Sequence, residues 1–332
     1  SFFLVYTRMA DNWLQSVPGR GRCAVAAKPL TPGTVVARFS GLPYAACPLP
    51  SQRDRLCARC LRSPGTKLAR CSKCKWAHYC GSNCQRADWA AHKHECAVLS
   101  SGKLDGLADA PAADILLAGR CLRRRHAAGS SPDGDDACFD ALEPAETLSE
   151  SDCALGSLAA SLGGLLPPAA TPEATAAAQA AAKLIGTFTR NNFGVLNDML
   201  SVVGAGCYPA AALLNHSCAP NCVLAFDGCT LEIRTVVAVE AGGELTHSYV
   251  DLCLCTKERR ATLSERYGFA CTCLRCEAPP SLPGGISVDA LLDSSLEASV
   301  RGLGGGSAAS KGGKDGKSEG GEALSFGVLA IR

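Results

Sequence analysis

Apolar and polar positions follow two different rhythms along the chain, and each rhythm predicts a different kind of element. The run TVVARF at residues 34–39 is short and rich in β-branched residues, which is typical of a strand. The segment AADILLAGRCLRRR at 112–125 is amphipathic and an alanine-rich run covers 173–188, so both predict helices because alanine is the best helix former. Further along, the pattern turns to β, and Asp227-Gly228 between two apolar runs is a strong hairpin signal.

Two stretches follow neither rhythm. Residues 133–152 hold eight acids and no base, which predicts a surface loop or a partly disordered insert. Residues 302–322 are rich in glycine and serine and predict a flexible linker. The final ALSFGVLAIR is apolar again and indicates an element that is cut short. Since the chain also begins without methionine, we expect a fragment of a longer protein.

Length and charge narrow the classes of protein without changing this picture. The chain has 332 residues and a formal net charge of +2, which allows two or three domains and does not favour a strong nucleic-acid binder or a membrane-surface protein. No apolar run approaches the roughly 18 to 20 residues of a membrane span, and the opening SFFLVY is too short for a signal peptide. We expect no contact with a membrane, and a location in the cytoplasm or the nucleus.

The 21 cysteines change the picture most, because many of them form Cys-x2-Cys pairs near histidine. This pattern favours zinc over disulfides, and a reducing compartment. The densest block offers eight ligands, namely Cys57, Cys60, Cys71, Cys74, Cys80, Cys84, His92 and Cys96. Eight ligands suit two tetrahedral zinc ions, and a block with so little apolar content needs metal binding to fold. His94 is a rival to His92 as a ligand.

A second cluster supplies three thiolates, those of Cys271, Cys273 and Cys276. Three ligands are one short of a closed structural zinc site. Cys218, in the segment LLNHSCAPNC, is the natural fourth ligand, and Cys253 and Cys255 are its competitors. The sequence therefore predicts three zinc ions in all.

The dense block resembles the MYND zinc finger in its ligand spacing and in the strings HYC and DWAAHKHEC. The resemblance implies an interleaved pairing, with one ion on Cys57, Cys60, Cys80 and Cys84 and the other on Cys71, Cys74, His92 and Cys96. It favours His92 over His94, since only His92 keeps the family's seven-residue gap after Cys84. It also implies a protein-recognition module for proline-rich peptides. Residues 53–96 carry ten Lys/Arg and three Asp/Glu, a basic excess that leaves DNA contact open as well.

The strings GRG, NHSCAPNC, GGELTHSY and RYGFACTCLRC follow the order and spacing of a SET domain with its post-SET zinc motif. With the finger inserted after the first strands, the chain is identified as a member of the SET–MYND (SMYD) family of lysine methyltransferases. This implies an α+β fold of short SET-domain sheets. The implied parts are the N-terminal part of the SET domain (16–50), the MYND finger (53–97), a helical insert (98–190), the core SET domain (191–250), the post-SET zinc motif (251–278), and a flexible linker with a segment cut short (279–332).

The resemblance implies a protein-lysine N-methyltransferase that uses S-adenosylmethionine and acts on a histone or another protein. Methyl transfer needs a neutral amine, an in-line approach and the exclusion of water. Free lysine, with a pKa near 10.4, is almost wholly protonated at neutral pH, so the site must help the amine to lose its proton. Tyr249 matches the main catalytic tyrosine of the family, and Tyr267 matches the second tyrosine of the lysine channel.

The resemblance also implies a set of cofactor-binding residues, namely Gly19, Arg20, Gly21, Asn191, Leu214, Asn215, His216 and Phe269. Asn192 is an alternative to Asn191, by a register slip of one. His247 departs from the small or apolar residue that is usual in the family, and we expect it to face solvent rather than alter the lysine channel. Two other functions stay open: a catalytically weak SET–MYND adaptor, and a transcriptional regulator that binds protein or DNA.

Overall fold

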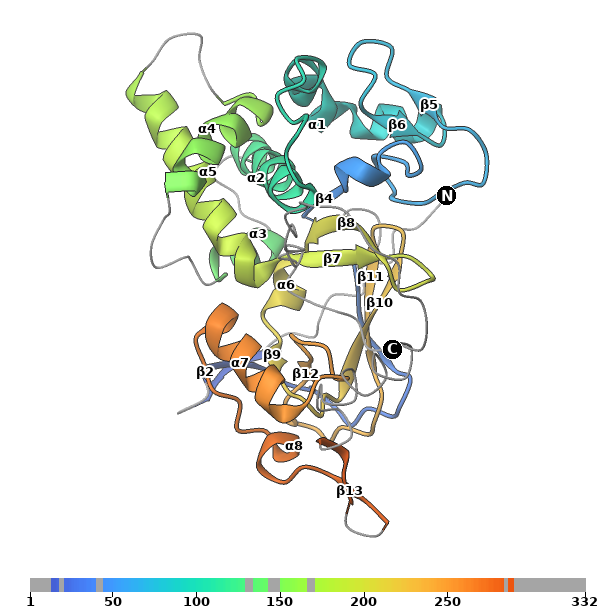
Figure 1. Cartoon of the computed structure of the whole chain (residues 1–332), viewed down its shortest axis with the longest axis vertical. Helices are drawn as coiled ribbons and strands as arrows, with labels where there is room; N and C mark the ends of the chain where they lie inside the picture. The colour runs from blue at the N-terminus through green and yellow to red at the C-terminus, as the bar shows by residue number, and fades with distance from the viewer. Residues whose placement is uncertain are drawn as a thin grey trace, which may run out of the picture.

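The computed structural model places short sheets at the centre of the molecule, with helices and a small finger above them in the view of Figure 1. Helices α7 (Thr256–Tyr267) and α8 (Leu274–Glu277) lie below the sheets in this view. The structure describes residues 13–17, 21–39, 44–128, 134–142, 150–165, 171–283 and 286–289. This α+β architecture of short sheets confirms the predicted fold class. None of the helices in these ranges is long and apolar enough to cross a membrane.

Two three-stranded antiparallel sheets form the central part. One has the order β10 (Cys222–Asp227), β11 (Thr230–Thr235), β3 (Val35–Phe39). The other has the order β4 (Ala45–Pro48), β8 (Val202–Cys207), β7 (Phe193–Leu196). The predicted strand at 34–39 and the hairpin at Asp227-Gly228 are confirmed, and Gly228 takes the positive φ of 58° that this turn requires.

Two smaller pairs bring the start of the chain beside its later motifs. Strand β1 (Leu14–Val17) is antiparallel to β2 (Gly21–Ala24), and β9 (Asn215–His216) is parallel to β12 (Thr246–His247). Leu245, next to β12, donates its backbone N–H to the Ala24 carbonyl at 2.7 Å. The remaining short strands are β5 (Ala69–Arg70), β6 (His78–Tyr79), β13 (Ser281–Leu282) and β14 (Ile286–Ser287).

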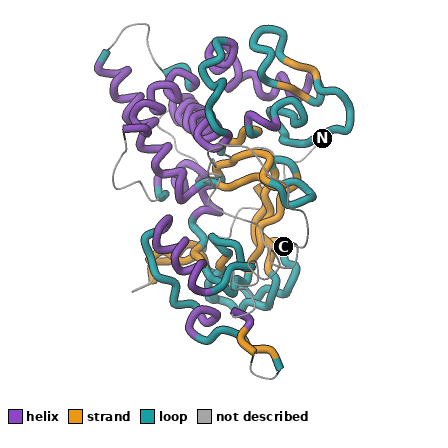
Figure 2. The backbone as a smooth tube through the Cα atoms, in the orientation of Figure 1, coloured by secondary structure: helices purple, strands orange, loops and turns teal. Residues whose placement is uncertain are grey.

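The long helices gather on one side of the sheets, as Figure 2 shows. They are α1 (Ser82–Ser100), α2 (Asp109–Ala128), α4 (Glu150–Leu162) and α5 (Pro172–Asn191), and the two predicted helices are confirmed within α2 and α5. Helices α4 and α5 pack so closely that a Cβ on Gly156 would lie 2.4 Å from the Ala178 carbonyl oxygen. The shorter helices are η1 (Pro50–Gln52), α3 (Gly134–Asp140), α6 (Pro209–Ala212), α7 (Thr256–Tyr267) and α8 (Leu274–Glu277).

Part of the acidic stretch is helical, so the prediction of a surface loop or partly disordered insert is wrong for residues 134–140 and 150–152. Helix α3 lies within it, and the Phe139 ring stacks on the Tyr44 ring with centroids 4.4 Å apart. The Tyr44 hydroxyl donates a hydrogen bond to the buried Asp136 carboxylate at 2.5 Å. Arg125 of α2 also pairs with the Asp136 and Asp140 carboxylates, at 3.3 and 2.9 Å, and so offsets the acidic charge of this helix. Residues 143–149 and the predicted linker at 302–322 lie outside the described residues.

The finger is part of the same body as the helices and the sheet. Trp76 and Tyr79 of the finger belong to one buried apolar cluster with Ile115 and Leu117 of α2. From the other side, the β10–β11 turn reaches the finger, where the Cys229 N–H donates to the carbonyl oxygen of Cys60 at 2.9 Å. The finger is therefore fixed on two sides.

Candidate active site and zinc centres

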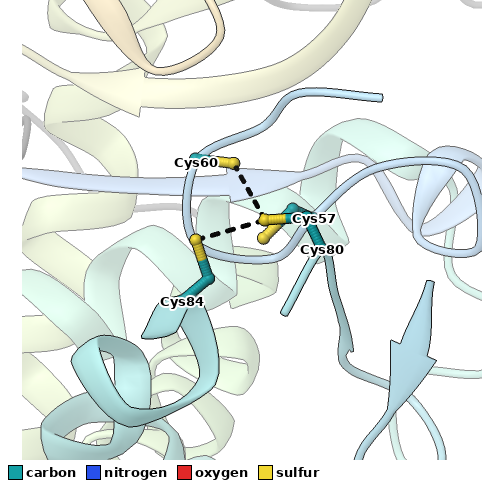
Figure 3. Close-up of side chains that lie close together, drawn as sticks. All are labelled: Cys57, Cys60, Cys80 and Cys84. Atoms are coloured by element: carbon teal, nitrogen blue, oxygen red, sulfur yellow. Dashed lines mark hydrogen bonds between the residues drawn. The ribbon is translucent and has the colours of Figure 1, made fainter. Parts of the chain in front are cut away.

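The first ligand set of the finger lies where a loop meets the start of α1. Figure 3 shows Cys57 and Cys60 on the loop, Cys80 on the segment before α1 and Cys84 in the first turn of that helix, with their sulfurs turned toward one another. The four sulfurs lie within 4.8 Å of one another, with Cys60 and Cys80 3.9 Å apart. A tetrahedral zinc ion with Zn–S bonds of about 2.3 Å separates its sulfurs by about 3.8 Å, so this set fits zinc.

The second ligand set of the finger is fully buried. It consists of Cys71, Cys74, His92 and Cys96. The sulfurs of Cys71 and Cys96 are 3.8 Å apart, and His92 Nε2 is 3.7 Å from the Cys74 sulfur. His92 and Cys96 are four residues apart on α1 and therefore share one face of the helix, whereas His94 lies outside the set. The structure thus groups the eight residues in the predicted pairing, with His92 rather than His94 in the second set.

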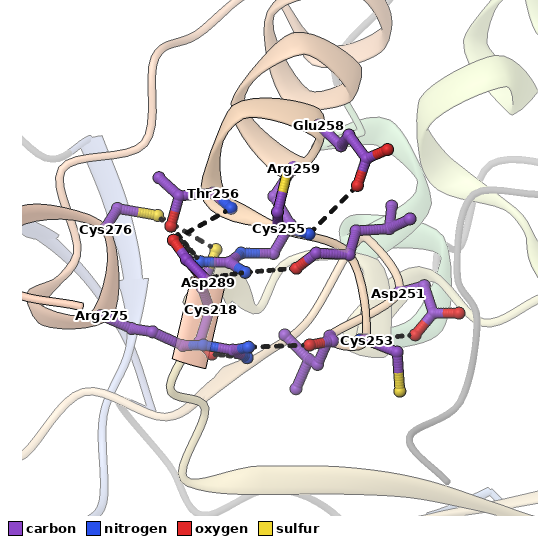
Figure 4. Close-up of polar contacts among 12 residues, drawn as sticks. Cys218, Asp251, Cys253, Cys255, Thr256, Glu258, Arg259, Arg275, Cys276 and Asp289 are labelled. Carbon is purple, nitrogen blue, oxygen red and sulfur yellow. Dashed lines mark hydrogen bonds and ion pairs between the residues drawn. The ribbon is translucent and has the colours of Figure 1, made fainter. Parts of the chain in front are cut away.

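The third set joins the NHSC segment to the post-SET segment. It consists of Cys218, Cys271, Cys273 and Cys276, with the Cys218 sulfur 3.5 Å from that of Cys276 and 3.9 Å from that of Cys271. Cys253 is exposed and Cys255 caps helix α7, so neither competitor joins the set (Figure 4). Within the described residues the structure thus contains three four-ligand sets that fit zinc, as predicted.

Sequence reasoning missed a buried arginine beside this third set. Arg259 of α7 is 0% exposed, and its guanidinium donates to the Leu254 carbonyl and the Thr256 hydroxyl, with Nη2 3.9 Å from the Cys276 sulfur (Figure 4). Four thiolates around one Zn²⁺ have a formal charge of −2, which a buried cation stabilises. Nothing in the polar pattern of α7 distinguishes Arg259 from its exposed neighbours.

A cavity of about 440 Å³ lies beside the third set. Seven of the predicted site residues line it: Gly21, Asn191, Asn215, His216, Tyr249, Tyr267 and Phe269. Leu214 takes part through its carbonyl oxygen, which accepts a hydrogen bond from the Tyr249 hydroxyl at 2.6 Å. Gly19 and Arg20 lie outside the described residues. The lining residues that sequence reasoning missed are Arg22, Arg190, Ala212, Leu213, Glu244 and Thr272.

Asn215 and His216 hold the walls of this cavity together. The Asn215 amide nitrogen donates to the Arg22 carbonyl at 2.7 Å and to the Glu244 carboxylate at 2.8 Å. His216 Nδ1 accepts the backbone N–H of Tyr249 at 3.0 Å. Burial lowers the pKa of His216 to about 3, so its ring is neutral and acts as an acceptor. Three distant parts of the chain are thereby held around one space.

Aromatic rings next to His216 form another part of the wall. The Tyr249 and Tyr267 ring centroids are 4.8 Å apart, and Phe269 lies 6.5 Å from Tyr267 and 6.0 Å from His216. Burial raises the pKa of Tyr267 to about 12, so its hydroxyl keeps its proton at neutral pH. Since Phe269 lies two residues before the zinc ligand Cys271, the third ligand set anchors this wall.

The comparisons with known proteins agree with these motifs. Residues 57–96 match the family of the MYND finger. Histone-lysine N-methyltransferase SMYD3 of mouse (Mus musculus) is 35% identical over 266 residues, which are 78% of this chain and 59% of that protein. N-lysine methyltransferase SMYD2-B of Xenopus laevis is 29% identical over 286 residues, which are 86% of this chain and 65% of that protein. The MYND finger and the similarity over most of this chain support an SMYD-type member of the SET and MYND domain proteins.

The chain spans about 59% of the length of the mouse SMYD3 relative. Among solved structures, the SET domain of LSMT bound to lysine and AdoHcy matches with a TM-score of 0.37 and 16% identity, covering 79% of this chain and 54% of that one.

The positions of Asn191 and Asn192 decide which of the two lies at the cavity. Asn191, at the end of α5, lines the cavity, whereas Asn192 is buried elsewhere and donates to the Asp114 carboxylate at 2.7 Å. The side chains turn to different sides because the helix ends between them. Asn191 is therefore the residue at the cavity.

His247 does not face solvent, so that prediction is wrong. Its side chain is buried behind Tyr249, with ring centroids 5.0 Å apart, and it also contacts Phe193 at 6.1 Å. Nδ1 donates to the Ser248 carbonyl at 3.1 Å, and burial lowers the pKa of His247 to about 4. The reason is that both residues of the short strand β12 are buried, so the usual in–out alternation of a strand is lost.

Proposed function

We propose that this SMYD-type protein is a protein-lysine N-methyltransferase that uses S-adenosylmethionine, with a histone or another protein as substrate. The observation that carries the proposal is the cavity of about 440 Å³, which Tyr249 and Tyr267 line together with Asn215 and His216. The names of the relatives, which are lysine methyltransferases, support the same reaction.

The two tyrosines are proposed to guide the substrate amine. Tyr249 is fixed by its hydrogen bond to the Leu214 carbonyl, and its hydroxyl oxygen keeps a lone pair that accepts a hydrogen bond from the amine. The tilted rings of Tyr249 and Tyr267 form an electron-rich surface that holds an ammonium or a methylated amine by cation–π attraction. The Tyr267 hydroxyl stays protonated at neutral pH, so it donates a hydrogen bond rather than removing the amine proton.

The other cavity residues are proposed to hold the cofactor, which supplies a methyl group on a sulfonium. Gly21 has a positive φ of 69° and open space where a Cβ would be, so the backbone can approach a ligand closely. The Asn215 amide nitrogen is engaged within the protein, which directs its carbonyl oxygen to other donors. Phe269 offers a partly exposed ring for stacking, and Asn191 adds a polar group. Gly19 and Arg20 are proposed to continue this site.

The MYND finger is proposed to recognise proteins through proline-rich peptides, with DNA contact as the alternative that its basic excess supports. Sets of free thiolates are stable in a reducing compartment, which supports a place in the cytoplasm or the nucleus. The division into an N-terminal SET part, finger, helical insert, SET core and post-SET segment remains a proposal.

The experiment measures binding of labelled S-adenosylmethionine and then transfer of the methyl group to histones or to bulk cell protein. We expect transfer by the wild-type chain. Tyr249→Phe keeps cofactor binding and loses transfer by about 10²-fold or more, because positioning of the amine is lost. Met199→Phe, at an exposed position outside the cavity, is the control and keeps both. Cofactor binding without transfer, unchanged by Tyr249→Phe, would favour an adaptor instead.

A further inference from the structure

A second cavity, of about 330 Å³, lies between helix α1 of the finger, helix α2 and strand β4. It shares no lining residue with the cavity around Tyr249. Neither the zinc sets nor the proposed methyl transfer uses it.

Alanines form much of the lining of this second cavity. They are Ala45, Ala46, Ala87, Ala90, Ala91 and Ala127. On α1, Ala87 and Ala90 are both exposed, so these methyl groups are accessible from solvent. Such a surface is apolar and offers no hydrogen-bonding side chain, and it therefore suits an apolar group of a ligand.

Basic side chains from three separate segments complete the lining: Arg59 of the finger loop, Lys93 and His94 of α1, and Arg120, Arg123 and Arg124 of α2. Arg120 is satisfied, because it donates to the Glu95 carboxylate at 2.7 and 2.9 Å and to the Ala46 carbonyl at 2.6 Å. Arg59 and Arg123 make no hydrogen bond or ion pair with the described residues. These two guanidinium groups are therefore available to bind a ligand.

Among the described residues that line this cavity, acidic groups are few. Asp88 is the one carboxylate among the described lining residues, and it already accepts the Tyr79 hydroxyl at 2.8 Å and lies 3.7 Å from Arg120. His94 Nε2 is buried without a hydrogen-bond partner among the described residues. The basic side chains in this lining attract an anionic ligand and repel a cation.

We propose that this cavity binds an acidic peptide segment in which an apolar side chain is flanked by carboxylates. The apolar side chain covers the alanines, and the carboxylates meet cations that come from three different segments rather than from one point. A volume of about 330 Å³ fits a few side chains and not a folded domain. A nucleic-acid backbone has phosphates but no apolar group to cover the alanines. An acidic peptide matches both the alanine surface and the basic side chains.

The test uses the full, zinc-loaded chain and fluorescence anisotropy of a labelled peptide, Glu-Asp-Leu-Asp-Glu. The matched probe is Gln-Asn-Leu-Asn-Gln, which has nearly the same shape and no carboxylate side chains. We expect the acidic probe to bind at least about tenfold more tightly, and its affinity to fall as salt rises. Equal affinity for the two probes would overturn the proposal.

Two variants locate the binding. Arg123→Gln removes a cation without a partner, and Ala90→Phe fills the cavity from an exposed helix position without changing any charge. Each is expected to weaken binding of the acidic probe by about tenfold or more. Lys257→Gln removes an exposed cation on α7, away from the cavity, and is expected to have no effect. An unchanged affinity in Ala90→Phe, or equal competition by random duplex DNA, would show that the peptide is not held in this cavity.

Discussion

The buried His247 makes a sharp prediction about acid stability. Its ring lies behind Tyr249, Nδ1 donates to the Ser248 carbonyl, and Nε2 is buried without a partner among the described residues. Replacing it by leucine, which has a similar size and no charge, removes the titratable group and keeps the packing. At neutral pH we expect a modest loss of stability, because the Ser248 carbonyl loses its donor while an unsatisfied buried nitrogen is removed.

The magnitude follows from the two pKa values of the ring. Burial lowers the pKa of His247 from 6.5 to about 4 in the folded protein. Above pH 6.5 the ring is neutral in both states, so folding does not depend on its protonation. Below pH 6.5 the unfolded chain binds a proton that the folded protein does not, and the free energy of unfolding falls until the folded ring is protonated near pH 4. The contribution lost is about 3 kcal/mol in total, of which about 1 kcal/mol is lost between about pH 7.5 and about pH 5.5.

The assay is urea unfolding of the wild-type chain and of His247→Leu at these two pH values. The wild-type free energy of unfolding is expected to fall by about 1 kcal/mol more than that of the variant. Zinc ligands and the other histidines are present in both proteins, so the difference isolates His247. His126→Leu, at an exposed position of α2, is the control and is expected to keep the wild-type dependence. The same pH dependence in wild type and His247→Leu would refute a buried, neutral ring.

Three further predictions concern the metal sets and the hairpin. Metal analysis is expected to find three zinc ions per chain and only two in Cys218→Ser, while Cys253→Ser, outside the ligand sets, keeps three. Gly228→Ala is expected to lower the free energy of unfolding in urea by at least about 1 kcal/mol more than the control Gly242→Ala. Both glycines have a positive φ, but only a Cβ on Gly228 would meet the Cys60 carbonyl oxygen, at 2.2 Å. Equal losses of free energy in the two variants would argue against this contact. A strong zinc chelator is expected to abolish the protease resistance of 57–96, because the finger relies on metal for folding, and resistance that persists without zinc would contradict this.

Much of the metal chemistry was predictable because it depends on spacing within short segments. The finger ligands are pairs a few residues apart, and the hairpin depends on two adjacent residues, Asp227 and Gly228. The burial of His247 was not predictable, since a two-residue strand gives too short a pattern to reveal that both of its faces are covered. Arg259 was missed for a related reason, because α7 is mostly polar and the cysteines that lie beside this arginine come from other segments of the chain.

The position of the zinc sets along the chain has a consequence for biosynthesis. All eight finger ligands lie within 57–96, so both finger ions can bind soon after this segment leaves the ribosome. The third set must wait for Cys276, and the neighbouring cavity joins Gly21 to Phe269 across almost the whole described chain. Closing such long loops is slow compared with local pairing. A nascent chain can therefore form the metal-loaded finger well before it forms the cavity around Tyr249, and a truncated translation product would keep the finger without the cavity.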